Sequence, residues 1–173
     1  MSTALDHTFL DQVNQHLGIA HKVCGLYFSD VDEKKDVVQE MLYQLWRAYP
    51  AFDGRSKFST WMYSVCLNTA LTYRRNNSKH QYLPLSLAHD QIPDEAAGDK
   101  EEGMHLLFEA IAALSQLNKA IVLLYLEDLS YEEIAQITGL SRSNVSVRLV
   151  RIKRELETFM KKQPKPYSDV SPG

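Results

Sequence analysis

The stretch from Leu129 to Leu156, LSYEEIAQITGLSRSNVSVRLVRIKREL, constrains the fold most, because it specifies two short helices joined by a tight turn. Ser130 followed by Glu133 is a capping box. In this motif the serine hydroxyl accepts a hydrogen bond from a free backbone amide of the first helical turn, and the glutamate carboxylate accepts one from the backbone amide of the serine. Gly139 supplies the positive φ that a tight turn needs, and Ser141 can cap the following helix. This pattern predicts a helix-turn-helix whose second helix continues into a basic segment.

The second helix of this motif has two faces of different chemistry. One face is apolar at helical spacing, and its residues predict a buried stripe: Val145, Leu149, Ile152 and Leu156. The other face carries small polar and basic side chains of the kind that read base edges and bind phosphates: Arg142, Ser143, Asn144, Ser146, Arg148, Arg151 and Arg154. An ordinary helical hairpin with a solvated polar face is the alternative. The capping box, the glycine turn and the basic face occur together, and this combination favours a DNA-binding helix-turn-helix over an ordinary hairpin.

Charge is distributed unevenly along the 173 residues, whose formal net charge is −3. Residues 142–162 hold seven basic and two acidic side chains, a balance of +5, whereas residues 76–103 hold six acidic and two basic ones, a balance of −4. This asymmetry predicts a DNA-facing carboxy-terminal end and a separate acidic segment. Hydrophobic residues make up 45% of the chain, which is enough for packed cores.

Two isolated cysteines, Cys24 and Cys66, have no metal-ligand spacing and are expected to be small core residues in a reducing cytosol. The amino terminus contains acidic residues and no long apolar run, which predicts neither a signal peptide nor a membrane span. The six histidines form no ligand motif. We therefore expect a cytoplasmic protein with no metal, no cofactor and no direct membrane insertion.

Helical periodicity predicts an all-α protein of two small helical domains joined by a flexible acidic linker. The first domain is expected over residues 1–77 and the linker over 78–103. The second domain, which contains the helix-turn-helix, is expected over 104–162, and a disordered tail over 163–173.

Three helices are expected in the first domain, over residues 13–27, about 31–49 and about 59–75. The apolar spacing of the second helix places Trp46 on its buried face. In the second domain, Asn118 is expected to cap a short helix that precedes the helix-turn-helix.

An acidic and polar stripe lies on the second expected helix. Asp36, Gln39 and Glu40 stand at i, i+3 and i+4, so they share one helix face. Such a stripe is usually a solvated surface, and its spacing alone is only weak evidence of a binding role.

A loop between the second and third expected helices combines basic, hydroxyl and aromatic groups. Single-stranded DNA needs such groups, because bases stack on rings and phosphates pair with cations. The candidates continue into the start of the third helix: Asp53, Gly54, Arg55, Ser56, Lys57, Phe58, Ser59, Thr60 and Trp61. Of these, Phe58 and Trp61 suit a core better than a stacking platform. Asn68, Arg74 and Arg75 lie further along the same helix and could add amide and phosphate contacts.

Two blocks of the sequence resemble bacterial RNA polymerase sigma factors of the small extracytoplasmic-function (ECF) group. The block DVVQEMLYQLWRAYPAFDGRSKFSTWMYSVCLNTALTYRR, residues 36–75, is similar to the second sigma region. The block ALSQLNKAIVLLYLEDLSYEEIAQITGLSRSNVSVRLVRIKREL, residues 113–156, is similar to the fourth. The order of the blocks on either side of a linker makes the resemblance specific. The chain departs from the pattern at Thr72, where many relatives carry an acidic residue.

The resemblance implies a role for each candidate surface. Asp36, Gln39 and Glu40 match the motif that docks on core RNA polymerase. The loop from Asp53 to Phe58, with Ser59 and Thr60, matches the segment that captures a flipped base of the −10 element. Asn68 and Arg75 match the DNA-facing helix that follows, with Arg74 as their neighbour.

For the carboxy-terminal block, the resemblance implies that residues 142–151 enter the major groove of the −35 element. The implied partners are core RNA polymerase, promoter DNA in duplex and single-stranded form, and a separate anti-sigma factor. The implied activity is the direction of promoter-specific transcription initiation.

Two other classes of function compete with this interpretation. An autonomous helix-turn-helix regulator that never joins polymerase would use residues 129–156 but leave the acidic stripe and the aromatic loop without roles. A metal-dependent hydrolase could use Asp36 and Glu40 with a histidine. However, the sequence contains no recognisable nucleophile–base pair or phosphate-binding glycine loop. We therefore expect no enzymatic activity.

Overall fold

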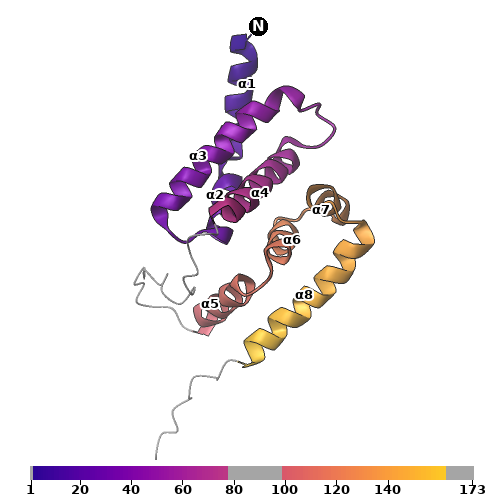
Figure 1. Ribbon diagram of the computed structural model, residues 1–173. Helices are drawn as coiled ribbons and strands as arrows, with labels where there is room; N and C mark the ends of the chain where they lie inside the picture. Colours follow the sequence, from indigo (N-terminus) through magenta and orange to yellow (C-terminus); the bar gives the residue numbers. More distant parts are fainter. Residues whose placement is uncertain (1, 78–98, 163–173) are drawn as a thin grey trace, which may run out of the picture.

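The computed structural model describes residues 2–77 and 99–162, and the regular elements of these two segments are all helices. They form an amino-terminal helical part over residues 2–77 and a carboxy-terminal one over 99–162 (Figure 1). The predicted all-α fold is confirmed for these segments. The predicted tail, residues 163–173, and most of the predicted linker, residues 78–98, lie outside the described residues.

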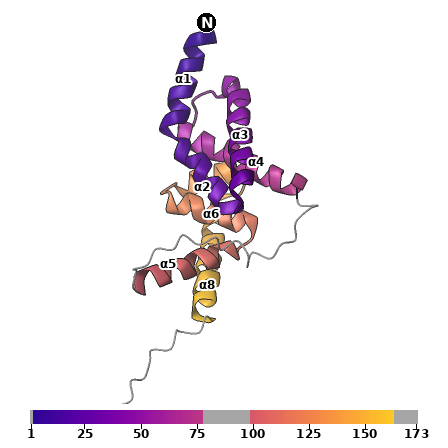
Figure 2. The same cartoon turned by 90° about the vertical axis from the view of Figure 1, so that its left-hand side faces the viewer.

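The amino-terminal part contains five elements: α1 (Ser2–Gln15), α2 (Leu17–Tyr27), α3 (Val31–Ala48), the 3₁₀ turn η1 (Tyr49–Ala51) and α4 (Phe58–Asn77). Helices α2, α3 and α4 pack on one another, while the amino-terminal end of α1 projects beyond them (Figure 2). The second half of α1 joins the core through the buried Phe9 and Val13. The loop between η1 and α4 lies at the surface of this part.

The helix predicted over residues 13–27 is interrupted at His16, so this prediction was wrong. The imidazole Nδ1 of His16 lies 2.9 Å from the carbonyl oxygen of Gln12, and the backbone amide of His16 donates to Val13 instead. A side chain that occupies a helical carbonyl competes with the backbone ladder. Gly18 lowers the helical propensity of the next turn, so the chain restarts as a second helix.

The buried stripe of α3 is narrower than predicted. Val37, Met41 and Leu45 are fully buried, whereas Trp46, expected inside, has 49% of its surface exposed. Residues at i, i+4 and i+8 already fill the contact with α2 and α4, so Trp46 lies beside it and meets Phe9 edge-on at 5.5 Å.

The carboxy-terminal part contains four helices: α5 (Asp99–Ala112), α6 (Gln116–Leu126), α7 (Tyr131–Thr138) and α8 (Arg142–Lys162). Helix α5 begins at Asp99, ahead of residue 104, where the second domain is expected to start. Acidic residues suit the first turn of a helix as well as a linker, so the composition of this segment does not fix where the helix starts. The cap predicted at Asn118 was wrong as well, because the Ser115 hydroxyl caps α6 and accepts from the Asn118 amide at 3.3 Å.

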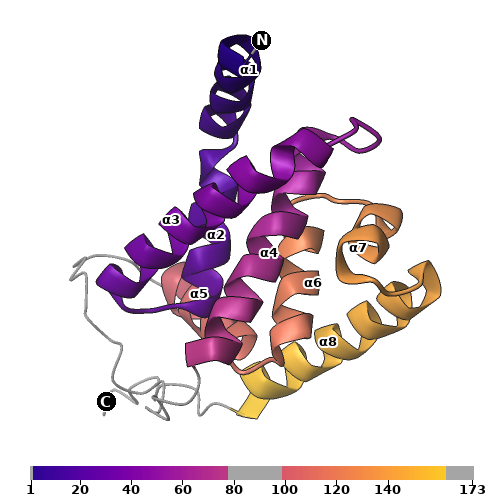
Figure 3. The ribbon, with the colours of Figure 1, turned by 45° about the horizontal axis from the view of Figure 1, so that its top comes forward.

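The two helical parts lie side by side (Figure 3). Helix α4 contacts α7, and residues of α4 and α6 line a common groove. Helix α3 lies on the opposite side of α4 from α6 and α7, so its outer face is directed away from the carboxy-terminal part (Figures 1 and 3).

Candidate nucleic-acid interface

The helix-turn-helix has the geometry that its sequence predicts. The Ser130 hydroxyl accepts from the Glu133 amide at 3.2 Å, and the Glu133 carboxylate accepts from the Ser130 amide at 2.8 Å. Gly139 adopts φ +76° between α7 and α8. The Ser141 hydroxyl then accepts from the Asn144 amide at 3.2 Å and caps α8. Because the Ser130 amide donates to its carboxylate, the pKa of Glu133 is held below its ordinary range.

Helix α8 is oriented by its apolar stripe. Val145, Leu149 and Ile152 are buried against α5, α6 and α7, which confirms the predicted inner face at these three positions. Leu156, predicted at the end of the same stripe, is half-buried. Five of the predicted DNA-binding residues are exposed: Arg142, Ser143, Asn144, Arg151 and Arg154. Ser146 and Arg148 are half-buried at the edge of this face.

Arg148 is directed toward the helix-turn-helix core. Its guanidinium Nη1 donates to the Asn118 Oδ1 of α6 at 3.2 Å. This contact gives Arg148 a structural partner, and its predicted role in DNA binding stays a prediction.

Two valines occupy the exposed face of α8 and were missed by the sequence analysis. Val147 and Val150 each have 49% of their surface exposed. Position 147 lies midway between buried positions 145 and 149, and a helix places such a residue on the opposite side. That spacing could have identified Val147. On a major-groove helix, an exposed apolar side chain is suited to contact the C5-methyl group of thymine.

The first residue of α8 is also tied to α7. Arg142 Nη1 lies 3.0 Å from Glu132 Oε1, and both side chains are more than half exposed. An ion pair this exposed contributes little to stability and is screened by salt, so phosphate can compete for the guanidinium.

The loop before α4 is a short turn that projects two cationic side chains. Gly54 adopts φ +74°. Asp53 Oδ1 accepts from the Arg55 amide at 3.1 Å, and Asp53 Oδ2 lies 2.9 Å from Arg55 Nε. This is an aspartate-stabilised turn. The side chains of Arg55 and Lys57 are exposed, and Ser56 is half-buried.

Aromatic rings hold the base of this loop. Phe52 lies 4.9 Å from Trp61 between ring centroids, and Phe58 lies 5.3 Å from Trp61. Tyr49 of η1 contacts Phe52 at 6.3 Å. Phe58 is buried and Trp61 is half-buried, so the two rings pack as core residues that anchor the loop.

Helix α4 carries a polar face beyond the loop. Asn68, Thr72 and Arg75 are exposed at i, i+4 and i+7 and line the groove shared with α6. Arg74 lines the same groove, and its Nη1 donates to the carbonyl oxygen of Tyr27 at 2.7 Å. The structure thus brings Asn68, Arg74 and Arg75 to one groove and gives Arg74 an additional structural contact.

The acidic stripe of α3 lies on its outer face. Asp36 and Gln39 are exposed, and the half-buried Glu40 accepts from Gln44 Nε2 at 2.7 Å. Tyr43 continues the stripe at i+7 from Asp36 with 56% of its surface exposed. Sequence reasoning missed Tyr43, although its helical spacing from Asp36 was visible.

The described residues also limit other kinds of site. Within residues 2–77 and 99–162, no three His, Cys, Asp or Glu side chains are grouped so that they could hold a metal ion. None of the helices in this part of the chain is both long and apolar enough to cross a membrane.

The fold and these surfaces define a DNA-binding protein built from two helical parts. The family model described as "Sigma-70 region 2" matches residues 12–80, and "Sigma-70, region 4" matches residues 104–156. The ECF RNA polymerase sigma-E factor of Escherichia coli is 33% identical in an alignment that covers 79% of this chain and 80% of the relative. The RNA polymerase sigma factor YlaC of Bacillus subtilis is 28% identical over 76% of this chain and 80% of its own.

A solved structure has the same fold. The sigma factor RpoE of Bartonella quintana, in complex with the anti-sigma factor NepR, superposes with a TM-score of 0.69 at 18% identity and covers 91% of this chain. The chain belongs to the ECF RNA polymerase sigma factors. Sigma factors are non-enzymatic transcription initiation factors, and an autonomous regulator is not favoured for this chain.

Proposed function

We propose that this sigma factor directs promoter-specific initiation through three separate surfaces, one for core RNA polymerase and two for DNA. The observation that carries the proposal is the separation of these surfaces. The outer face of α3, the loop and polar face of α4, and the outer face of α8 lie on different helices and carry different chemistry.

The −35 element is the proposed target of α8. A helix of this width fits the major groove, where Ser143 and Asn144 near its first turn can reach base edges. Arg142, Arg151 and Arg154 are exposed along the same helix and can neutralise phosphates. Ser146 and Arg148 flank this surface from half-buried positions.

The −10 element is the proposed target of the loop and of α4. The exposed Arg55 and Lys57 supply cations for the opened strand, while Ser56, Ser59 and Thr60 supply hydroxyl groups beside the turn of Asp53 and Gly54. Holding one flipped base offsets part of an unstacking cost on the order of a few kcal/mol. Asn68 and Arg75 extend the surface along α4.

The outer face of α3 is the proposed docking site for core polymerase. Asp36, Gln39 and Glu40 supply acidic and amide groups, and Tyr43 adds an exposed ring next to them. Acidic groups around an aromatic ring suit a basic helical partner, because charge aligns the surfaces and the ring supplies buried area.

Regulation and location follow from the same function. We infer that a separate anti-sigma protein binds this chain, since the related fold of RpoE was captured with the anti-sigma factor NepR. We also infer that the protein acts in the cytoplasm, where its polymerase and promoters are.

The proposal is tested by capture on immobilised core polymerase. The variant Asp36→Ala, Gln39→Ala, Glu40→Ala should lose most of its binding to core while it keeps its affinity for duplex promoter DNA. The matched control is Asp6→Ala, Asp11→Ala, Gln12→Ala on α1, outside the proposed docking face, and it should bind core like the wild type. Equal retention of both variants would contradict the docking assignment.

A further inference from the structure

A carboxylate of the carboxy-terminal part joins two helices of the amino-terminal part. Glu127, directly after α6, accepts from Lys22 Nζ at 2.8 and 2.7 Å through its two oxygens. The hydroxyl of Tyr63 on α4 donates to the same carboxylate at 3.0 Å. These donors hold the pKa of Glu127 below its ordinary value, chiefly through Lys22, so the carboxylate is charged at neutral pH. Lys22, Tyr63 and Glu127 are called the latch below.

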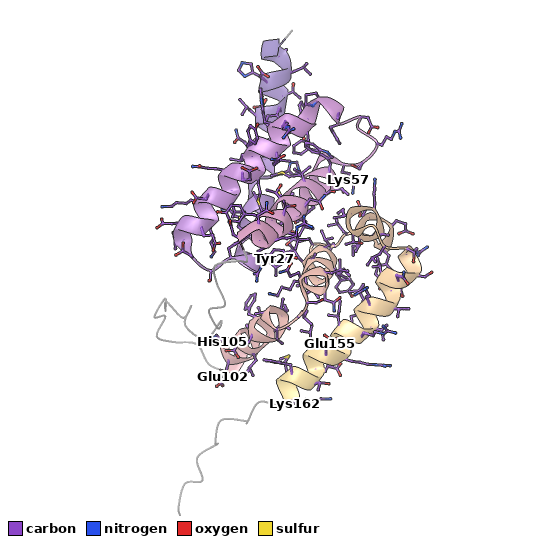
Figure 4. All side chains as sticks on the ribbon, viewed as in Figure 1. Tyr27, Lys57, Glu102, His105, Glu155 and Lys162 are labelled. Carbon is purple, nitrogen blue, oxygen red and sulfur yellow. The ribbon has the colours of Figure 1, made fainter. Side chains whose placement is uncertain are left out.

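Two further contacts close the same interface. Thr60 Oγ1 donates to Glu133 Oε1 at 3.3 Å, and the charge of Lys57 also favours the ionised Glu133. At the other end of α4, the Tyr27 hydroxyl donates to the carbonyl oxygen of Gln116 at 2.6 Å. Figure 4 shows Tyr27 where the amino-terminal part meets α6, and Lys57 near α7. The interface therefore has polar contacts near both ends of α4.

This interface covers the proposed −10 surface. Thr60 is buried and its hydroxyl bonds Glu133 of α7, and Ser59 lines a hollow that Glu127 also lines. Asn68 and Arg75 line the groove whose other wall is Gln116 and Leu117 of α6. A DNA strand that is to run along α4 must displace α6 and α7 from this side.

The proposed polymerase-docking face of α3 and the proposed −35 face of α8 stay accessible when the two helical parts are packed together, an arrangement called closed below. The docking face of α3 lies on the far side of α4 (Figure 3), and the outer residues of α8 are exposed. The closed arrangement is thus selective, because it withholds one of the three surfaces and leaves two available.

We propose that the closed arrangement is an autoinhibited state of the free sigma factor, in which the latch keeps the −10 surface away from single-stranded DNA until the two helical parts separate. The inference rests on the proposed role of the loop and α4 in −10 binding. A partner that binds only the open form shifts the equilibrium by its differential affinity for the two forms.

The interface has the composition of a contact that can reopen. Lys22 and Glu127 keep 50% and 28% of their side-chain surface exposed, so water can replace their ion pair. Closure also places the buried Lys119 of α6 near Arg74 of α4, and burial together with this like charge lowers the pKa of Lys119. The unfavourable pair offsets part of the stabilisation that the latch provides.

The test measures closure and strand binding on the full-length free protein. Donor and acceptor dyes on Arg47→Cys of α3 and Thr158→Cys of α8 report the separation of the parts, since both positions are exposed and the native cysteines are buried. A fluorescent single-stranded oligonucleotide with the non-template −10 sequence of a promoter mapped by transcription reports strand binding.

Glu127→Lys should lower energy transfer and tighten strand binding by about threefold to tenfold, the scale of one charged hydrogen-bonded contact. The charge swap Lys22→Glu, Glu127→Lys should restore both signals toward the wild type. Glu157→Lys makes the same charge change on exposed α8 and should leave energy transfer unchanged. Tyr63→Phe, which removes only the hydroxyl, should change both signals in the same direction as Glu127→Lys but by less. It replaces Glu127→Lys as the test of the latch if Glu127→Lys does not fold.

Unchanged energy transfer in both latch variants would overturn the inference. So would an equal gain of strand affinity in Glu127→Lys and Glu157→Lys, which would reflect net charge alone. Opening with no gain in affinity would also overturn autoinhibition. The proposed function is judged separately by core-dependent transcription with Asn68→Ala, which does not depend on the latch.

Discussion

Arg148 of α8 donates from Nη1 to Asn118 Oδ1 of α6 at 3.2 Å, and so a basic residue of α8 takes part in the packing of the carboxy-terminal helices. Arg148 and Arg151 are only three positions apart, but Arg148 is half-buried and Arg151 is exposed. Two arginines of one basic helix thus have different partners.

We expect Arg148→Ala and Arg151→Ala to separate stability from DNA affinity. Arg148→Ala should lower the free energy of unfolding by about 1 kcal/mol, because it removes a partly buried hydrogen bond. Arg151→Ala should change stability by less than about 0.5 kcal/mol and should reduce the slope of log affinity against log salt by about 1. Urea unfolding and salt-dependent binding to duplex promoter DNA measure the two effects. Equal losses of stability in the two variants would contradict the assignment.

Val147 should contribute to recognition of the −35 element without contributing to the core. Val147→Ala should weaken binding to duplex promoter DNA several-fold and leave unfolding unchanged, whereas Val145→Ala at a fully buried position should cost about 1–2 kcal/mol of stability. Replacing −35 thymidines by deoxyuridines removes the C5-methyl groups and should weaken wild-type binding but not Val147→Ala binding. The same sensitivity to deoxyuridine in both proteins would exclude a methyl contact.

Two glycines with open surroundings should respond in opposite directions to alanine. Beyond the adjacent residues and the local helix backbone, no atom lies within 4 Å of a Cβ added at Gly139 or at Gly25, so steric clashes do not distinguish them. Gly139 has φ +76°, and Gly139→Ala should destabilise the chain by about 1–2 kcal/mol. Gly25 lies inside α2, and Gly25→Ala should stabilise it by about 0.5–1 kcal/mol. Thermal unfolding of both variants checks the signs, and a stabilising Gly139→Ala would contradict the turn geometry.

The two cysteines should be unreactive in the folded protein. Burial raises the pKa of Cys24 to about 11 and that of Cys66 to about 12. At pH 8 both thiols are protonated, and we expect a thiol reagent to label them only after urea unfolds the chain. Because both folded values exceed the ordinary 9.0, the unfolded state loses these protons first, and the free energy of unfolding should fall as the pH rises from about 9 to 11. Rapid labelling in native buffer would contradict this burial.

The features that were predictable from the sequence depend on neighbouring residues. The capping box of Ser130 and Glu133, the positive φ of Gly139 and the inner stripe of α8 each follow from residues within a few positions of one another. Local reasoning failed at the start of α6, where the sequence analysis selected Asn118 as the cap. Ser and Asn are both favourable cap residues, and only the observed start of α6 at Gln116 identifies Ser115.

The remaining features depend on contacts between distant segments. Trp46 has helical spacing that suits a core, but α2 and α4 leave room only for its neighbours on α3. Lys22 and Glu127 are separated by more than half of the chain, and no local sequence pattern indicates that they form a pair. Composition and resemblance are enough to identify the candidate surfaces. Only the packing of the helices shows that these surfaces are separate and that α6 and α7 cover one side of α4.

The most direct test of the central claim is promoter-dependent transcription by purified core polymerase, with and without this chain, on DNA enriched from its own genome. Our account predicts initiation at defined promoters only when the chain is present. It also predicts loss of initiation with Asp36→Ala, Gln39→Ala, Glu40→Ala and retention with the α1 control variant. Sequence-specific binding to DNA with no association with core and no initiation would contradict the account.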